Sequence, residues 1–262
     1  MEKIKVFLAD WQVLFREGIH FILSGEEDFE VIGEATSSEE ALNFIENNPP
    51  QVAIFNVNRG KPSGIEITRR IKQNLPSVAI ILIMDSYNDE QLFAAMKSGA
   101  SACLSKDMEP EELLHNIRKV AQGEYPISQA LLTPEIASRV LGEFEASSAI
   151  NEEMGNLLAC LLPTEVEILH HIAGGSLFEE ISKVLGVNEE SIRQHLDVVL
   201  NKLVANERSR ALIEVVQSNL TSALSKVKGA GRPAADYITR EEFTTFREDL
   251  KERFKSLLGE VS

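Results

Sequence analysis

The chain has 262 residues, of which 44% are apolar and 26% are charged, a balance typical of a globular protein with one or two domains. No apolar run approaches the roughly 18 residues of a membrane span, and the first residues lack a signal-peptide pattern, so we expect a cytoplasmic protein with no membrane partner. The net charge of −15 opposes nonspecific binding to nucleic acid. Cys103 and Cys160 lack His or Cys neighbours at metal-ligand spacing, which favours buried, reduced thiols and no metal site.

Residues 1–123 predict a doubly wound α/β domain. Strand-like apolar runs at 4–9, 29–33, 52–55, 78–84 and 102–104 alternate with helical patterns at 14–23, 39–47, 65–75, 90–98 and 110–121. Five such units in succession indicate a parallel sheet of the flavodoxin-like order, in which ligands bind beyond the carboxyl ends of the strands. The third strand ends at Asn56, so this residue is expected at the functional edge.

The residues at these strand ends resemble the receiver domains of NarL/FixJ-type response regulators. The resemblance implies a CheY-like fold and a phosphorylation pocket whose positions are held by Asp10, Trp11, Asn56, Met84 and Lys106. In the family, a phosphoacceptor Asp stands in place of Asn56, a second acid in place of Trp11 and a hydroxyl residue in place of Met84. An amide is no nucleophile for phosphoryl transfer and a poor ligand for Mg²⁺. The resemblance therefore predicts a degenerate pocket, a pseudo-receiver with no cofactor and no metal.

Two pocket positions keep the identity that the resemblance implies. Asp10 and Lys106 are expected to form a charge pair over Asn56, with a structural role. Asp85 stands where a small residue admits phosphate, and its negative charge would repel a phosphate donor.

The replacements also change the polarity of the pocket. Trp11, Met84 and Cys103 make it more apolar than in the family. Such a pocket suits either a collapsed core or a small-molecule site, and both readings stay open.

Residues 124–160 predict a helical connector. Thr133 precedes Pro134 in the manner of an N-cap before a proline at the first helical position, so a helix is expected over 134–144. The small and polar residues 145–151 predict a linker.

Residues 161–216 predict an all-α helix-turn-helix domain. Gly174, Gly175 and Gly186 divide the apolar periodicity into three helices, with Asn188 as N-cap of the third and a further helix after Asn206. A helix, a glycine turn and a second helix can place that second helix in the major groove.

This stretch resembles the LuxR-type output domain that follows NarL/FixJ receivers. The resemblance makes 188–202 the recognition helix and predicts the DNA contacts. Arg193, Gln194 and Asp197 would face base edges, and Ser191, Lys202 and Arg208 would lie near phosphates.

The end of the chain predicts a flexible linker over 217–236 and an amphipathic helix over 237–262. Apolar residues recur there at steps of three and four, at Phe243, Phe246, Leu250, Phe254, Leu257 and Val261. This stripe could join two subunits into a homodimer.

Two functional hypotheses follow, and neither is an enzyme. The first is a promoter-binding transcriptional regulator that acts without phosphorylation and takes a protein or small molecule as its input. The second is a protein-interaction module whose helix-turn-helix does not bind DNA, since Glu179, Glu189, Glu190 and Asp197 oppose the phosphates.

Overall fold

The computed structural model describes residues 3–57, 62–86, 88–154 and 158–229, and the chain divides into two compact units. The first unit comprises Met1–Phe144 and Leu161–Val204, and the second Glu145–Cys160 and Ala205–Ser262. Within the described residues, no helix has the length and apolarity of a membrane span.

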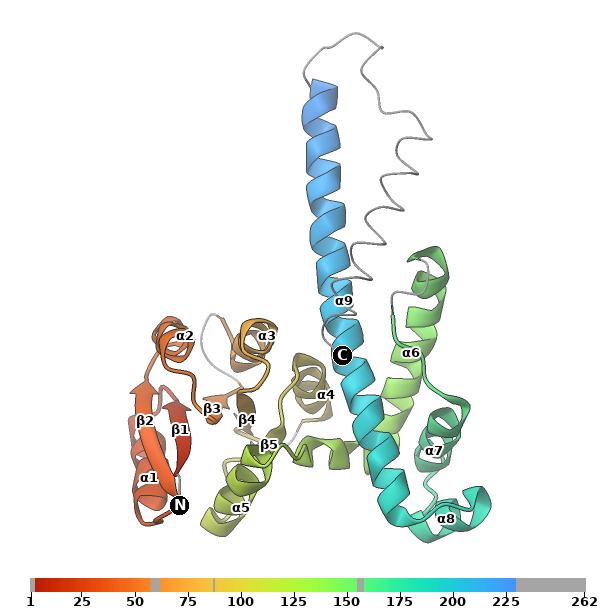
Figure 1. Ribbon diagram of the computed structural model, residues 1–262. Helices are drawn as coiled ribbons and strands as arrows, with labels where there is room; N and C mark the ends of the chain where they lie inside the picture. The colour runs from red at the N-terminus through yellow and green to blue at the C-terminus, as the bar shows by residue number, and fades with distance from the viewer. Residues whose placement is uncertain (1–2, 58–61, 87, 155–157, 230–262) are drawn as a thin grey trace. The chain divides into compact units, whose positions relative to one another are not determined.

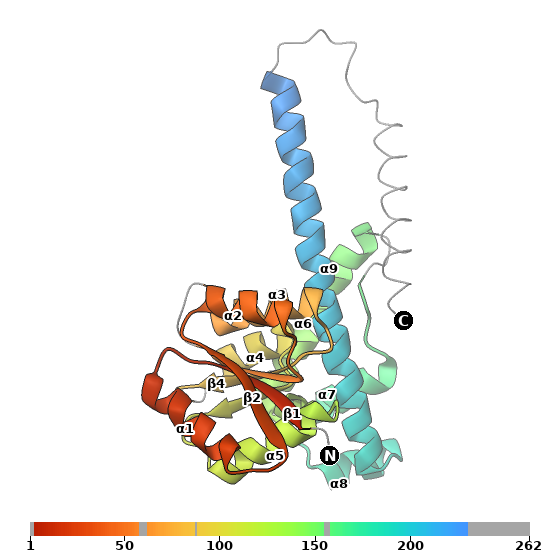
Figure 2. The same cartoon turned by 60° about the vertical axis from the view of Figure 1, so that its left-hand side comes forward.

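The first unit contains a five-stranded parallel sheet in the order β2-β1-β3-β4-β5, as the sequence predicts. Its strands are β1 (Ile4–Ala9), β2 (Phe29–Ala35), β3 (Val52–Asn56), β4 (Ala79–Met84) and β5 (Ala102–Ser105). The helices that follow them are α1 (Val13–Ser24), α2 (Ser38–Asn47), α3 (Gly64–Asn74), α4 (Asp89–Ser98) and α5 (Pro110–Ala121). α1 and α5 cover one face of the sheet, while α2, α3 and α4 cover the other (Figures 1 and 2).

Alternation along the central strands divides the core between the two faces of the sheet. On β4, Ile80, Leu82 and Met84 belong to the cluster that packs on α2, α3 and α4. The intervening residues Ile81 and Ile83 join α1 and α5 in the other cluster. Because both faces of a parallel sheet are covered, the strand reads as a continuous apolar run.

The start of α3 fixes the backbone next to the end of β3. Ser63 caps the helix by accepting a hydrogen bond from the Glu66 N–H, and the Glu66 carboxylate accepts one from the Ser63 N–H at 2.7 Å. Gly64 follows directly and lies against the main chain of Asn56, where an added Cβ would stand 2.2 Å from the carbonyl oxygen. The absent side chain of Gly64 is therefore what lets α3 begin so close to β3.

The connector is more helical than the sequence predicts. A 3₁₀ segment, η1 (Pro126–Leu132), leads into α6 (Pro134–Met154), so the helix expected over 134–144 continues through the predicted linker. Ser147 shows the reason, because it is 3% exposed and its hydroxyl accepts a hydrogen bond from the Arg210 guanidinium in the second unit. Ser147 therefore serves helix packing.

The helix-turn-helix region has the three predicted helices, α7 (Pro163–Ala173), α8 (Phe178–Leu185) and α9 (Glu189–Gly229). Gly186 ends α8 with a positive φ of 67°, and the Asn188 side chain accepts a hydrogen bond from the Ser191 N–H at 2.7 Å. The predicted glycine turn and N-cap are confirmed.

Helix α9 does not break where the sequence predicts. It continues for 41 residues, about 60 Å, so the separate helix after Asn206 and a linker beginning at 217 are both wrong. Asn206 is buried and pairs through its side chain with the backbone N–H and carbonyl of Ala159, at 2.7 and 2.9 Å. Its amide therefore hydrogen-bonds the backbone of a neighbouring segment, and the helix continues through this residue. The predicted amphipathic helix over 237–262 lies outside the described residues.

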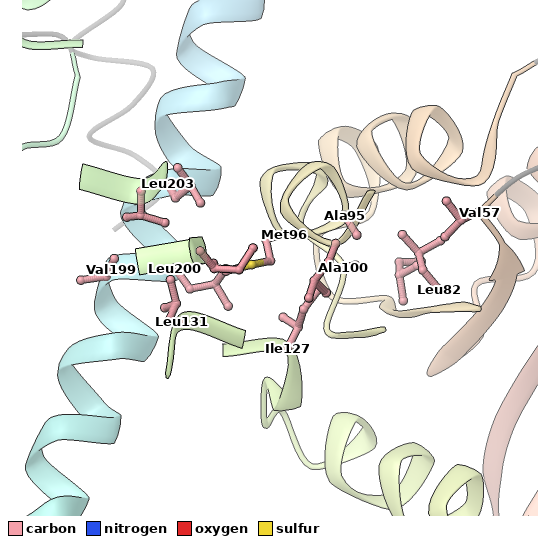
Figure 3. Close-up of a cluster of buried hydrophobic side chains, with 14 of the residues drawn as sticks. Val57, Leu82, Ala95, Met96, Ala100, Ile127, Leu131, Val199, Leu200 and Leu203 are labelled. Atoms are coloured by element: carbon pink, nitrogen blue, oxygen red, sulfur yellow. The ribbon is translucent and has the colours of Figure 1, made fainter. Parts of the chain in front are cut away.

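Within the first unit, the sheet domain and the helix-turn-helix helices share one apolar core. Met96 of α4 and Leu131 of η1 belong to the same buried cluster as Val199, Leu200 and Leu203 of α9, and Figure 3 shows Met96 reaching toward Leu200. At the edge of this contact, the Lys97 ammonium lies 3.1 Å from the Glu143 carboxylate of α6. The sheet domain thus covers part of the apolar face of α9.

The contact of Gly64 with β3 predicts a large effect of a small substitution. Gly64→Ala should lower the free energy of unfolding by about 2 kcal/mol, because the new methyl group would overlap the Asn56 carbonyl. Gly18→Ala is the matched control, since a Cβ there meets no atom within 4 Å. At this exposed position of α1, alanine should raise the free energy of unfolding by up to about 1 kcal/mol. Urea denaturation of both variants measures the difference, and equal free energies of unfolding would contradict the close packing of Gly64 against β3.

Candidate functional site

Two strand ends meet at the carboxyl edge of the sheet through a hydrogen bond between Asn56 and Asp10. The Asn56 side-chain N–H₂ donates to the Asp10 carboxylate at 3.1 Å, and both residues are buried, at 6% and 7% exposure. The second carboxylate oxygen of Asp10 accepts the Gln12 N–H at 2.8 Å. Asp10 and Asn56, predicted from the sequence as pocket residues, are therefore adjacent and bonded to each other.

Lys106 lies at the same edge but does not pair with Asp10 as expected. Its ammonium lies 2.5 Å from the Asp85 carboxylate and 2.5 Å from the Gln12 side-chain oxygen, and it stands over the Phe15 ring. The charge pair predicted over Asn56 is wrong, because Asp85 supplies a closer anion. Gln12 carried no signal that singled it out in the sequence.

A second group missed by sequence reasoning surrounds Arg16. This buried guanidinium donates to the backbone carbonyl of Asp10 at 2.9 Å and to the Glu34 carboxylate at 2.8 Å. Glu34 also contacts the His20 imidazole. Burial alone would raise the pKa of Glu34, but the hydrogen bonds from His20 and Arg16 hold it below its ordinary value. The charge of Arg16 is thus balanced within the group.

The Met84 side of the edge is closed by apolar packing. Met84 is 2% exposed within the core, and Cys103 packs against the same cluster, where burial raises the pKa of its thiol to about 12. A collapsed core, one of the two readings open from the sequence, describes this side. Cys160 was expected to be buried, and this is wrong, since the residue is exposed.

The opposite side of Asn56 is open. A pocket of about 270 Å³ lies between the ends of β1 and β3 and the start of α2. The 43% exposed indole of Trp11 forms part of its wall. Its lining consists of Ala9, Asp10, Trp11, Thr36, Ser37, Ser38, Glu39, Phe55, Asn56, Gly64 and Ile67. In a sheet of this order, the gap between β1 and β3 is the topological switch point where ligands bind.

These residues do not fit the Mg²⁺ that the fold family implies. The Asn56 amide directs a donor, not an oxygen, at the Asp10 carboxylate, and an apolar indole stands at the next position, Trp11. Mg²⁺ requires several oxygen ligands in near-octahedral geometry. Nor do three His, Cys, Asp or Glu side chains come together at metal-binding distance anywhere in the described ranges.

The predicted DNA-contact residues all lie on the amino-terminal half of α9. Arg193 and Gln194 are exposed, with the Arg193 guanidinium 5.0 Å from the Phe178 ring centre and the Gln194 amide 3.3 Å from the Glu190 carboxylate. Ser191 and Asp197 are half-buried on the same helix, and Arg208 is half-buried in the second unit.

Lys202 has a structural partner. Its ammonium lies 2.7 and 2.8 Å from the two oxygens of Glu165, a residue of α7 that is fully buried. Glu165 also accepts the Leu162 N–H at 2.7 Å and so caps its own helix. The contact joins α7 to α9 and holds the recognition helix in place. Its geometry gives Lys202 a packing role beside the phosphate contact predicted for it.

A five-stranded parallel sheet of this order, followed by a helical domain, is the arrangement that the sequence resemblance predicts for a response regulator. The response regulator receiver domain family matches residues 6–118. Among relatives, the chain is 30% identical over 220 residues to the uncharacterized transcriptional regulatory protein YxjL of Bacillus subtilis, covering 84% of this chain and 98% of that one. The nitrate/nitrite response regulator protein NarL of Escherichia coli is 30% identical over 219 residues, with the same coverage. The chain therefore belongs to the NarL-type response regulators.

Among solved structures, the signal receiver domain of the putative response regulator NarL from Mycobacterium tuberculosis is 27% identical. The match covers 47% of this chain and 100% of that domain, with a TM-score of 0.46.

The buried Glu165 predicts the cost of losing its cation. Lys202→Met should lower the free energy of unfolding by about 3 kcal/mol, because it leaves a buried carboxylate unpaired. Lys183→Met, which removes the same charge from an exposed site on α8, should change it by no more than about 0.5 kcal/mol. Chemical denaturation compares the two, and a Lys202→Met variant as stable as the control would refute the packing role.

Proposed function

We propose that this chain is a DNA-binding transcriptional regulator whose receiver domain acts without phosphorylation. The observation that carries the proposal is the Asn56–Asp10 hydrogen bond, which puts an amide donor where receivers of this family present a nucleophilic carboxylate. An amide cannot accept a phosphoryl group as an acyl phosphate, so activation by a phosphate donor is excluded at this residue.

The surroundings of Asn56 support the same proposal. Met84, which is buried and apolar, stands at the position of the family's hydroxyl residue. The carboxylate of Asp85 forms an ion pair with the Lys106 ammonium. A phosphoryl group would therefore meet a neutralised lysine and a nearby carboxylate. Both changes weaken electrostatic stabilisation of an added dianion.

DNA binding is supported by the exposed surface of α9. Arg193 and Gln194 are open to solvent while the core of the first unit covers the opposite face of the helix, at Ile192, Leu196 and Val199. Arginine can bind guanine through O6 and N7, and glutamine can bind adenine through N6 and N7. The relatives named as transcriptional regulators point to the same activity. The regulator is cytoplasmic and homodimeric and has no catalytic role.

A second candidate is a protein-interaction module that does not bind DNA. It is favoured by the exposed acids Glu179, Glu189 and Glu190 and by the engagement of Gln194 with Glu190. Carboxylates at the start of a recognition helix suit the helix dipole but repel phosphates.

Selection of genomic DNA fragments by the purified full-length protein distinguishes the two candidates. The regulator should enrich a shared site at low salt with no phosphate donor, and Arg193→Ala should lose about tenfold or more in affinity, as expected for one bidentate base contact. Arg70→Ala is the matched control, because it removes an exposed arginine from α3. An absence of enrichment at low salt would favour the interaction module.

A further inference from the structure

We infer that the pocket between β1, β3 and α2 is a binding site for a small organic cation, an amine or a guanidine. The inference goes beyond the proposed function, because it concerns binding at the receiver edge and holds whether or not α9 binds DNA. Its basis is the geometry around Asp10.

Asp10 is a buried carboxylate facing a cavity, and its cationic neighbours are engaged elsewhere. Lys106 pairs with Asp85, and Arg16 pairs with Glu34 while touching only the backbone carbonyl of Asp10. Within the described ranges, no ammonium or guanidinium lies within ion-pair distance of the Asp10 carboxylate. A buried charge without a counter-ion is costly, so a cation entering the pocket gains more here than at the surface.

The carboxylate also has room to bind. Each Asp10 oxygen accepts one hydrogen bond, from the Gln12 N–H or the Asn56 amide. An ionised carboxylate offers about four acceptor directions, so two bonds leave capacity toward the cavity.

The rest of the lining selects for positive charge and against anions. Helix amino-termini at this edge would ordinarily attract anions, but here carboxylates of the chain accept one backbone N–H beside the start of α2 and one beside the start of α3. Glu40 accepts the Thr36 N–H at 3.2 Å, and Glu66 accepts the Ser63 N–H. Glu39 is the second acidic residue in the pocket lining, beside Asp10. The carboxylates of Asp10 and Glu39 in the lining would therefore repel a phosphate or carboxylate ligand.

Trp11 supplies the apolar wall that an organic cation requires. Its indole face can bind an ammonium or guanidinium through a cation–π contact as well as a flat hydrocarbon body. A volume of about 270 Å³ lies just below the roughly 300–1,000 Å³ of drug-sized sites, so the ligand is smaller than a nucleotide. An inorganic metal ion fits less well, since it would gain little from the indole.

The chain carries its own reporter of binding, because Trp11 is its one tryptophan. The probes are phenethylamine, the neutral 2-phenylethanol and the anionic phenylacetate, which share one hydrocarbon body and differ in charge. Titration of the full-length protein should give a saturable change in Trp11 fluorescence with phenethylamine. The alcohol should bind about tenfold more weakly and phenylacetate not at all, as expected when a charged hydrogen bond is lost.

Matched variants locate the effect. Asp10→Asn keeps the acceptors for Gln12 and should weaken phenethylamine binding by about tenfold or more. Glu39→Gln, at an exposed position that does not endanger folding, should weaken it by a smaller factor. Asp107→Asn removes an exposed acid outside the pocket and should leave the affinity unchanged.

Three results would overturn the inference. One is equal binding of phenethylamine and phenylacetate, and another is equal affinity of the Asp10→Asn and Asp107→Asn variants. The third is a lack of saturable change in both the native chain and an Arg59→Gln/Lys61→Gln variant, which removes two cations of the chain close in sequence to Asn56. DNA selection is measured separately, so loss of either activity leaves the other testable.

Discussion

The hydrogen bond between the Asn56 amide and the Asp10 carboxylate determines what the receiver edge can do. In a parallel sheet the ends of β1 and β3 lie side by side, so the side chains at these ends can share a ligand or bond to each other. Here the amide of Asn56 bonds directly to Asp10 at 3.1 Å and takes the place of a third species. An amide is no nucleophile for phosphorus and a poor ligand for Mg²⁺, which is the basis of the proposal that this receiver acts without phosphorylation.

The charges around that bond are distributed so that Asp10 faces the cavity while the neighbouring cations pair with other acids. Asp85 engages Lys106, and Glu34 engages Arg16 and His20. On one side of Asn56, the Met84 side chain packs in the hydrophobic core, while on the other side a pocket lies beside Trp11. The edge is therefore packed on the Met84 side and holds a cavity on the Trp11 side.

The order of the sheet and its helices could be predicted from the sequence because apolar periodicity directly reflects burial in this fold. The pocket residues Asp10 and Asn56 could be placed for the same reason, since each directly follows or ends a buried strand. The ion pairs could not, because Lys106 can reach several acids and only the folded positions of Asp85 and Gln12 decide among them. Periodicity likewise could not tell that Asn206 binds Ala159 inside a continuous helix, since asparagine also ends helices.

The most direct test of a receiver that works without phosphate is intact-protein mass spectrometry after incubation with acetyl phosphate and Mg²⁺. A receiver that carries the acceptor aspartate serves as the positive control in the same reaction, and peptide mapping locates any adduct. The mass of this chain should stay unchanged while the control gains a phosphoryl group. A phosphoryl adduct on residues 3–123 of this chain would contradict it.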